Sequence, residues 1–119
     1  MKFVCLGSRE TEAEILKNEY KEAKRHGEVR LSDTRLFYRY FIKIRYIDYE
    51  EIVNAYLREE SGESGEFLLK EFYLMLRTKD GSLHKLRTER SENAKAVLAY
   101  LEKTQGHIAV GFDRLSQSE

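Results

Sequence analysis

Hydrophobic and charged side chains alternate with a period of two from residue 28 onward, a pattern that predicts β-strands. Val29 and Leu31 alternate with charged residues, and the polar turn 32–34 follows them. One parity then carries apolar and aromatic residues, which are Leu36, Tyr38, Tyr40, Ile42, Ile44 and Tyr46. Because this run is too long for one ordinary strand, we expect the chain to reverse near residues 41–43, although no glycine marks the reversal.

The second half of the chain predicts a longer hairpin. Residues 67–78, FLLKEFYLMLRT, are apolar on both parities, which is typical of a strand covered on both faces. Asp80 and Gly81 stand at the centre of the turn 79–82 and predict a tight hairpin, with residues 83–89 as the returning strand. The acidic segment 60–66, ESGESGE, is expected to form a mobile loop.

Two segments show helical spacing. Thr11 and Glu14 match a capping box, and Gly27 is a natural stop, so we predict a helix over residues 11–26. Ser91 is the expected N-cap of a second helix that runs to about residue 105. Its apolar face consists of Ala94, Val97, Leu98 and Leu101. Residues 1–6 should form a short strand or a docked terminus, and residues 108–112 should pack against the body.

Composition narrows the class of protein. The 119 residues predict a single domain over 1–119, with a core at about 28–105, a helical extension over 1–27 and a tail over 106–119. The chain has 21 basic and 21 acidic residues, which argues against nucleic acid as a partner. Cys5 is the one cysteine, and there is neither a secretory leader nor a long apolar run, so a cytoplasmic location without a transmembrane segment is expected.

Two short runs carry a resemblance to a known family. Residues 31–39, LSDTRLFYR, are similar to the "leu-thr-asp-x-arg-leu-ile-tyr" hairpin of bacterial pleckstrin-homology-like (PH-like) domains and their GRAM-type relatives. Residues 47–53, IDYEEIV, look like the "ile-pro-tyr-x-asp-ile" corner of the same domains. The resemblance covers about residues 28–105 and implies a bacterial protein with an α+β, mainly β fold. That fold is a bent antiparallel barrel of about seven strands with a C-terminal capping helix, here joined by an extra N-terminal helix.

Six basic residues form the first candidate site, and it would bind anions. They are Arg35, Arg39, Lys43 and Arg45, which share one strand parity, and Lys85 and Arg87 on a later strand. If they face the same way, they could hold a phosphate group or an acidic partner. The alternative is a solvated face whose charges are neutralised by acids such as Glu59, Glu71 or Glu89. The interleaved aromatic residues could also stack on RNA bases, although core packing is the simpler explanation.

The second candidate site is an interaction patch on the outward parity of the 67–78 strand. It consists of Phe67, Leu69, Tyr73 and Met75. Leu16 and Tyr20 of the first helix should cover part of this surface, and the remainder could bind a protein partner or a second copy.

The sequence offers no catalytic, cofactor-binding or metal-binding motif, since His26, His84, His107 and Cys5 lie far apart. We therefore predict a non-catalytic PH-like module that binds a protein or self-associates. The alternative is a peripheral binder of anionic lipids or phosphate ligands through the basic strand face.

Overall fold

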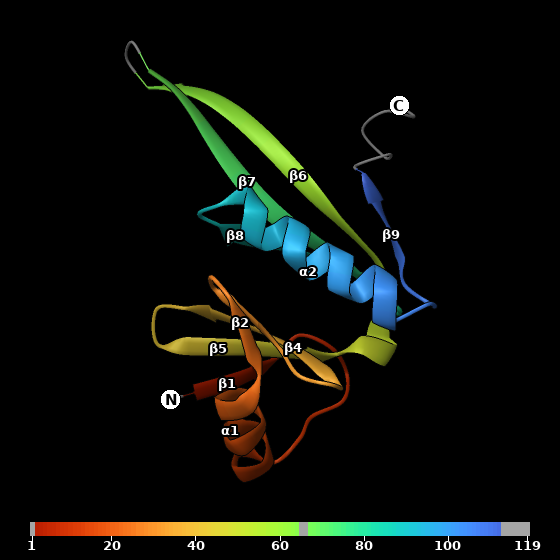
Figure 1. The fold of residues 1–119 in the computed structure, drawn as a ribbon. Helices are drawn as coiled ribbons and strands as arrows, with labels where there is room; N and C mark the ends of the chain where they lie inside the picture. Colours follow the sequence, from red (N-terminus) through yellow and green to blue (C-terminus); the bar gives the residue numbers. More distant parts are fainter. Residues whose placement is uncertain (1, 65–66, 113–119) are drawn as a thin grey trace.

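The structure is a computed structural model that describes residues 2–64 and 67–112. Within these residues the chain forms two β-sheets and two α-helices, so the predicted α+β, mainly β class is confirmed (Figure 1). The strand order is β1-β5-β4-β3-β2 in one sheet and β8-β7-β6-β9 in the other. The two sheets hold nine described strands and are not closed into a barrel, so the prediction of a bent antiparallel barrel of about seven strands was wrong.

The first sheet is built mainly from two short hairpins. Its strands are β1 (Lys2–Cys5), β2 (Lys24–His26), β3 (Val29–Leu31), β4 (Arg35–Tyr40) and β5 (Lys43–Asp48). β1 runs parallel to β5, and the other neighbours are antiparallel. The turn η1 (Tyr49–Glu51) then leads the chain into the second sheet.

The second sheet is a long hairpin with one strand added at each edge. Its strands are β6 (Ile52–Ser64), β7 (Phe67–Thr78), β8 (Leu83–Thr88) and β9 (Ala109–Phe112). β9 pairs parallel with β6, so the C-terminal apolar segment docks on the body as predicted. The tight turn between β7 and β8 is also confirmed, with Gly81 at a φ of +90°.

Helix α2 (Ser91–Thr104) lies between the two sheets and shares a core with both (Figure 1). The predicted apolar face of Ala94, Val97, Leu98 and Leu101 is buried. It packs with Val29 and Leu36 of the first sheet and with Leu74 and Leu86 of the second. The N-terminal boundary differs from the prediction, because Arg90 takes the cap position and Ser91 is the first helical residue.

Helix α1 (Ala13–Glu22) packs on the opposite face of the first sheet. Leu16 and Tyr20 contact a second cluster that contains Phe37, Ile44 and Tyr46. The first sheet is therefore covered on both faces, and this explains why consecutive residues of β4 are buried. The predicted cover of the 67–78 strand by this helix was wrong, since α1 lies on the other sheet.

The first helix is also shorter than predicted. Thr11 does not cap it, because Glu12 takes the cap position without a side-chain hydrogen bond. Residues 24–26 form β2 instead of the last helical turn, and β2 returns into β3 through a two-residue turn. Gly27 stands in this turn with a φ of +64°, so its role is to reverse a hairpin and not to end a helix.

The segment 60–66 was predicted to be a loop, and this was wrong for residues 60–64. They continue β6 and pair with β7, from Glu60 opposite Glu71 to Ser64 opposite Phe67. Residues 65 and 66 lie outside the described residues. β8 pairs with β7 only over residues 72–77, so the outer part of the hairpin is a two-stranded arm that projects past α2 (Figure 1).

Candidate anion-binding cleft

Three arginines from neighbouring strands lie on the α1 face of the first sheet. Arg25 of β2 stands directly opposite Arg30 of β3, and Arg30 stands opposite Phe37 of β4. Arg39 is two residues beyond Phe37 and so points to the same face. Like charges directly opposite each other on a sheet destabilise it. The three arginines thus gather positive charge on this face, at a cost to the stability of the sheet.

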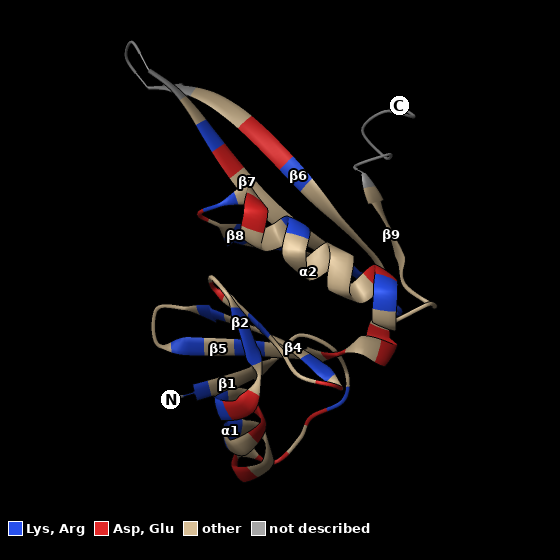
Figure 2. Ribbon diagram, in the orientation of Figure 1, with Lys and Arg blue, Asp and Glu red and all other residues tan. Residues whose placement is uncertain are grey.

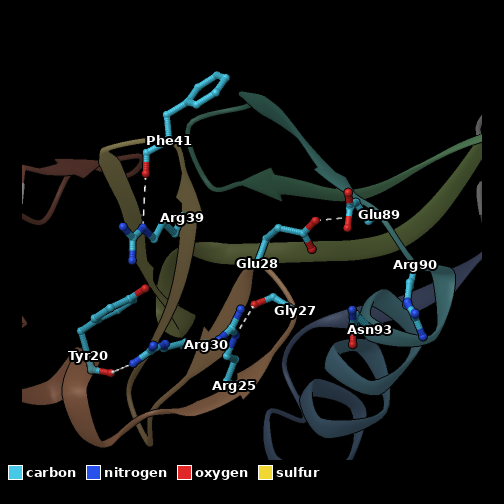
Figure 3. Close-up of a pocket in the computed structure, with 10 residues that line it drawn as sticks. All are labelled: Tyr20, Arg25, Gly27, Glu28, Arg30, Arg39, Phe41, Glu89, Arg90 and Asn93. Carbon is cyan, nitrogen blue, oxygen red and sulfur yellow. Dashed lines mark hydrogen bonds between the residues drawn. The ribbon is translucent and has the colours of Figure 1, made fainter.

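A cleft of about 400 Å³ separates these arginines from the start of α2. Figure 3 shows Arg25, Arg30 and Arg39 on the sheet side, with Arg90 and Asn93 on the helix side. We name this the arginine cleft, after Arg25, Arg30, Arg39 and Arg90. The positive end of the α2 dipole lies at the same place, because the helix begins at Ser91.

The turn between β2 and β3 fixes the distance between the two walls. A Cβ atom added at Gly27 would lie 2.3 Å from Nδ2 of Asn93, so the turn packs directly against α2. The backbone N–H of Arg39 donates to the carbonyl of Glu28 at 2.9 Å, which ties β4 to the same turn. A side chain at position 27 would require the side chain of Asn93 to move.

Backbone carbonyls hold three of the four arginines. Nε of Arg25 donates to the carbonyl of Gly27 at 3.1 Å, and Nε of Arg39 donates to the carbonyl of Phe41 at 3.2 Å. Nη1 of Arg30 donates to the carbonyl of Tyr20 at 3.1 Å, and its guanidinium lies 4.2 Å from the centre of the Tyr20 ring. A guanidinium has five N–H donors, so these bonds position the side chains without saturating them.

None of the four arginines forms an ion pair with a carboxylate among the described residues. Two carboxylates do line the cleft, those of Glu28 and Glu89. Oε2 of Glu28 accepts the backbone N–H of Glu89 at 2.9 Å (Figure 3), and its Oε1 is buried without a hydrogen-bond partner in the described part of the chain. Four arginines against two glutamates leave two positive charges in excess.

An apolar tip stands beside the arginine cleft, formed by Tyr40, Phe41 and Ile42 at the turn from β4 to β5. Phe41 is 77% exposed and Ile42 is 76% exposed, and Phe41 also lines the cleft. Arg39 and Lys43 flank the tip, and Lys2 of β1 lies opposite Lys43. Figure 2 shows the basic colour at the adjacent starts of β1 and β5. The predicted reversal at this point is confirmed, and it requires a φ of +57° at Phe41.

A second cleft, of about 300 Å³, lies between the first sheet and β8. We name it the β8 cleft; it is lined by Leu6, Tyr38, Tyr40, Arg45, His84, Lys85, Leu86 and Arg87. The Tyr38 hydroxyl donates to the carbonyl of Arg87 at 2.7 Å, and burial raises the pKa of Tyr38 to about 12. Lys85 pairs with Glu60 at 2.7 Å, and Arg87 pairs with Glu71 at 3.5 Å, so acids neutralise two of its cations.

The six basic residues of the first candidate site do not share one face. Tyr40 pairs with Lys43 across the reversal, so the odd-numbered residues of β4 and the odd-numbered residues of β5 face opposite sides of the sheet. Arg35 and Arg39 therefore face α1, while Lys43 and Arg45 face the opposite side. Arg35 is also unavailable to a ligand, because it is mostly buried and pairs with Glu19 and, at 2.8 Å, with Asp48.

The structure buries part of the predicted interaction patch. Met75 is only 2% exposed, and Tyr73 is half-buried, with Nζ of Lys85 lying 4.2 Å from its ring centre. Leu69 is 53% exposed, and the side chain of Phe67 lies outside the described residues. Among the three members whose side chains the structure describes, Leu69 is the one that is exposed.

The histidines and the cysteine lie apart. His84 lines the β8 cleft, Nε2 of His107 lies 2.8 Å from the carbonyl of Tyr49, and Sγ of Cys5 lies 3.1 Å from the carbonyl of Arg9. Burial raises the pKa of the Cys5 thiol and lowers the pKa of His26. Within residues 2–64 and 67–112, no group of three or more His, Cys, Asp and Glu side chains is placed to hold a metal ion.

Neither described helix is long and apolar enough to cross a bilayer.

Comparison with known protein families places the chain in a family. The model of the family described as "Domain of unknown function (DUF6709)" matches residues 2–118. No curated protein matches the chain, and no solved structure does.

Proposed function

Because the chain belongs to the DUF6709 family, whose function is unknown, we propose a function from the surface of the protein itself. It is a non-catalytic module that attaches peripherally to anionic membrane surfaces from the cytoplasmic side. The observation that carries this proposal is the exposed apolar tip, which stands between basic residues and beside the arginine cleft.

The tip and its surroundings supply two attractions that act together. Large apolar side chains such as Phe41 and Ile42 gain free energy when they leave water for the boundary of the acyl chains. Basic residues near an anionic leaflet add about 1 kcal/mol each. The whole chain has no net charge, so this attraction depends on the local placement of Arg39, Lys43 and Lys2.

The PH-like relationship is part of the same proposal. It is supported by the two short sequence runs and by the position of α2, which follows the antiparallel strands and packs its apolar face onto both sheets. The site differs from the six-residue site predicted from sequence, since three of its arginines, Arg25, Arg30 and Arg90, were not among those six.

Vesicle flotation at low ionic strength tests the proposal. The full chain should float with vesicles that contain phosphatidylserine and should stay in solution with pure phosphatidylcholine vesicles. Ile42→Ser should lower the bound fraction several-fold, whereas Ile15→Ser, at a site 51% exposed on α1, should leave it unchanged. Equal binding of the two variants, or no binding of the natural chain, would remove membrane attachment.

Self-association is the second candidate, and the β6–β7 arm favours it. β9 pairs with β6 only over residues 54–57, so no described strand pairs with the outer edge of residues 59–64. The chain contains no proline, which is one of the usual blocks to edge pairing. Light scattering after size exclusion should detect a dimer at high concentration, and a strict monomer would exclude this role.

A further inference from the structure

We propose that the arginine cleft is a discrete binding site for a phosphate monoester in its dianionic form. This inference deepens the proposed function and depends on it only for the source of the ligand, which would be a monoester headgroup in a membrane. A free phosphate monoester carries the same chemistry. The cleft itself needs no membrane in order to bind it.

The strongest argument is the cross-strand pair of Arg25 and Arg30. Two guanidinium groups directly opposite each other repel, and neither forms an ion pair with a carboxylate among the described residues. An anion between them would convert this repulsion into attraction.

The charge and the donors of the cleft match a dianion. The lining carries two positive charges in excess, and a phosphate monoester carries up to two negative charges at neutral pH. Its three terminal oxygens accept hydrogen bonds well, and guanidinium groups approach them as two-pronged donors. The Nη groups of Arg25 and Arg39 are suited to this role, because in each residue Nε makes the bond to the backbone.

Helix α2 adds a second, independent contribution. It has 14 residues and begins next to Arg90, so its positive dipole end faces the cleft. The exposed carboxylate of Glu92 is not part of the lining, but it lies at the helix start near Arg90 and offsets part of this positive potential. The guanidinium groups of the sheet and the positive end of the helix thus face the same space.

The cleft favours a monoester over a diester. A phosphodiester has one negative charge and two terminal oxygens. It would neutralise only one of the two excess positive charges of the cleft and would accept fewer hydrogen bonds from the guanidinium groups. The β8 cleft makes a natural control site, because Glu60 and Glu71 already pair with Lys85 and Arg87 there.

Titration calorimetry with glycerol 3-phosphate on the full chain, at low salt and pH 7.5, tests the site without any membrane. Arg39→Gln and Arg90→Gln should each weaken binding about tenfold, since hydrogen bonds to charged groups are among the stronger ones. Lys85→Gln is the matched control and should change binding less than twofold. Lowering the pH to 5 should also weaken binding of the unchanged protein, because the second pKa of the phosphate is about 6 and the ester becomes a monoanion.

A second experiment, with lipid vesicles, distinguishes a membrane headgroup from a soluble ester as the ligand. Vesicles of phosphatidic acid, a monoester, should bind more tightly than phosphatidylglycerol vesicles of equal surface charge, and Arg39→Gln should abolish this preference. If glycerol 3-phosphate binds as described but no vesicle does, the cleft is a site for a soluble ester and membrane attachment fails. If vesicles bind without a monoester preference and glycerol 3-phosphate does not bind, this inference is overturned while membrane attachment stands.

Discussion

The arginine cleft and the β8 cleft carry similar basic side chains, and they differ in what surrounds those side chains. In the β8 cleft, Lys85 and Arg87 pair with Glu60 and Glu71 of the projecting hairpin. In the arginine cleft, backbone carbonyls hold the guanidinium groups of Arg25, Arg30 and Arg39, and no described carboxylate pairs with them. A carbonyl fixes a cation in place without cancelling its charge, so the second arrangement stays available to an anionic ligand.

A third basic position completes the comparison. Arg35 is paired like Lys85 but is mostly buried, and it holds α1 and the end of β5 together through Glu19 and Asp48. Basic residues thus occur in three settings. Arg35 joins two elements through buried ion pairs, Lys85 and Arg87 form ion pairs at the surface, and the arginines of the cleft have no carboxylate partner among the described residues. The predictions below separate these settings, beginning with the largest expected effect.

Arg35→Gln should lower the free energy of unfolding by about 3 kcal/mol, because it leaves two carboxylates partly buried without their cation. Arg39→Gln, at an exposed position, should change it by no more than about 0.5 kcal/mol. Urea unfolding followed by circular dichroism measures both. Similar losses in the two variants would mean that the arginine cleft is a structural element.

Gly27→Ala should lower the free energy of unfolding by about 2 kcal/mol, because an alanine resists a φ of +64° and its Cβ would collide with Asn93. Gly62→Ala is the matched control, since its Cβ meets nothing within 4 Å and its φ is not positive. The control should stay within about 0.5 kcal/mol of the natural chain. Thermal unfolding of both proteins checks this, and a neutral Gly27→Ala would show that the turn does not set the walls of the cleft.

The double substitution Glu60→Gln and Glu71→Gln should make the β8 cleft more like the arginine cleft. It frees Lys85 and Arg87, and each freed cation near an anionic surface adds about 1 kcal/mol, or about fivefold in affinity. Flotation with phosphatidylserine vesicles should therefore show tighter binding than the natural chain. Unchanged affinity would indicate that this cleft does not face the membrane.

Phe41→Gly should leave stability unchanged or raise it by up to about 1 kcal/mol, because glycine adopts the φ of +57° without strain. Ile42→Gly, the neighbouring control, gains no such relief and should lose about 0.5 kcal/mol. Both variants should bind vesicles less well. A clear loss of stability in Phe41→Gly would show that this ring is a packing element and not a membrane contact.

Local signals in the sequence predicted much of the fold. The apolar run 67–78, the Asp80-Gly81 turn and the spacing of Ala94, Val97 and Leu101 each specify an element without reference to distant residues. The elements that were predicted wrongly are those that form only because another segment pairs with them. Residues 24–26 have the composition of a helix end and become a strand only because β3 pairs with them, and residues 60–64 resemble a loop but pair with β7.

The candidate site was harder to predict, for two physical reasons. A reversal that places Tyr40 opposite Lys43 moves the following basic residues to the other face, and no glycine marked the register of that turn. Ion pairing also depends on contacts between distant segments, such as Lys85 with Glu60, 25 residues apart. One signal was available: Gly27 stands directly before a strand-like run and fits a hairpin turn as well as a helix stop, and the hairpin would have placed Arg25 opposite Arg30.

The most direct test of the account is nuclear magnetic resonance of the arginine Nε–Hε groups during titration with inorganic phosphate at pH 7.5 and low salt. The account predicts that the signals of Arg25, Arg30, Arg39 and Arg90 shift together and saturate with one dissociation constant. The signals of Arg35 and Arg87, which are paired with carboxylates, should stay in place. Shifts of Arg87 equal to those of Arg39, or no saturable shift at all, would contradict the claim that unpaired arginines form the binding site.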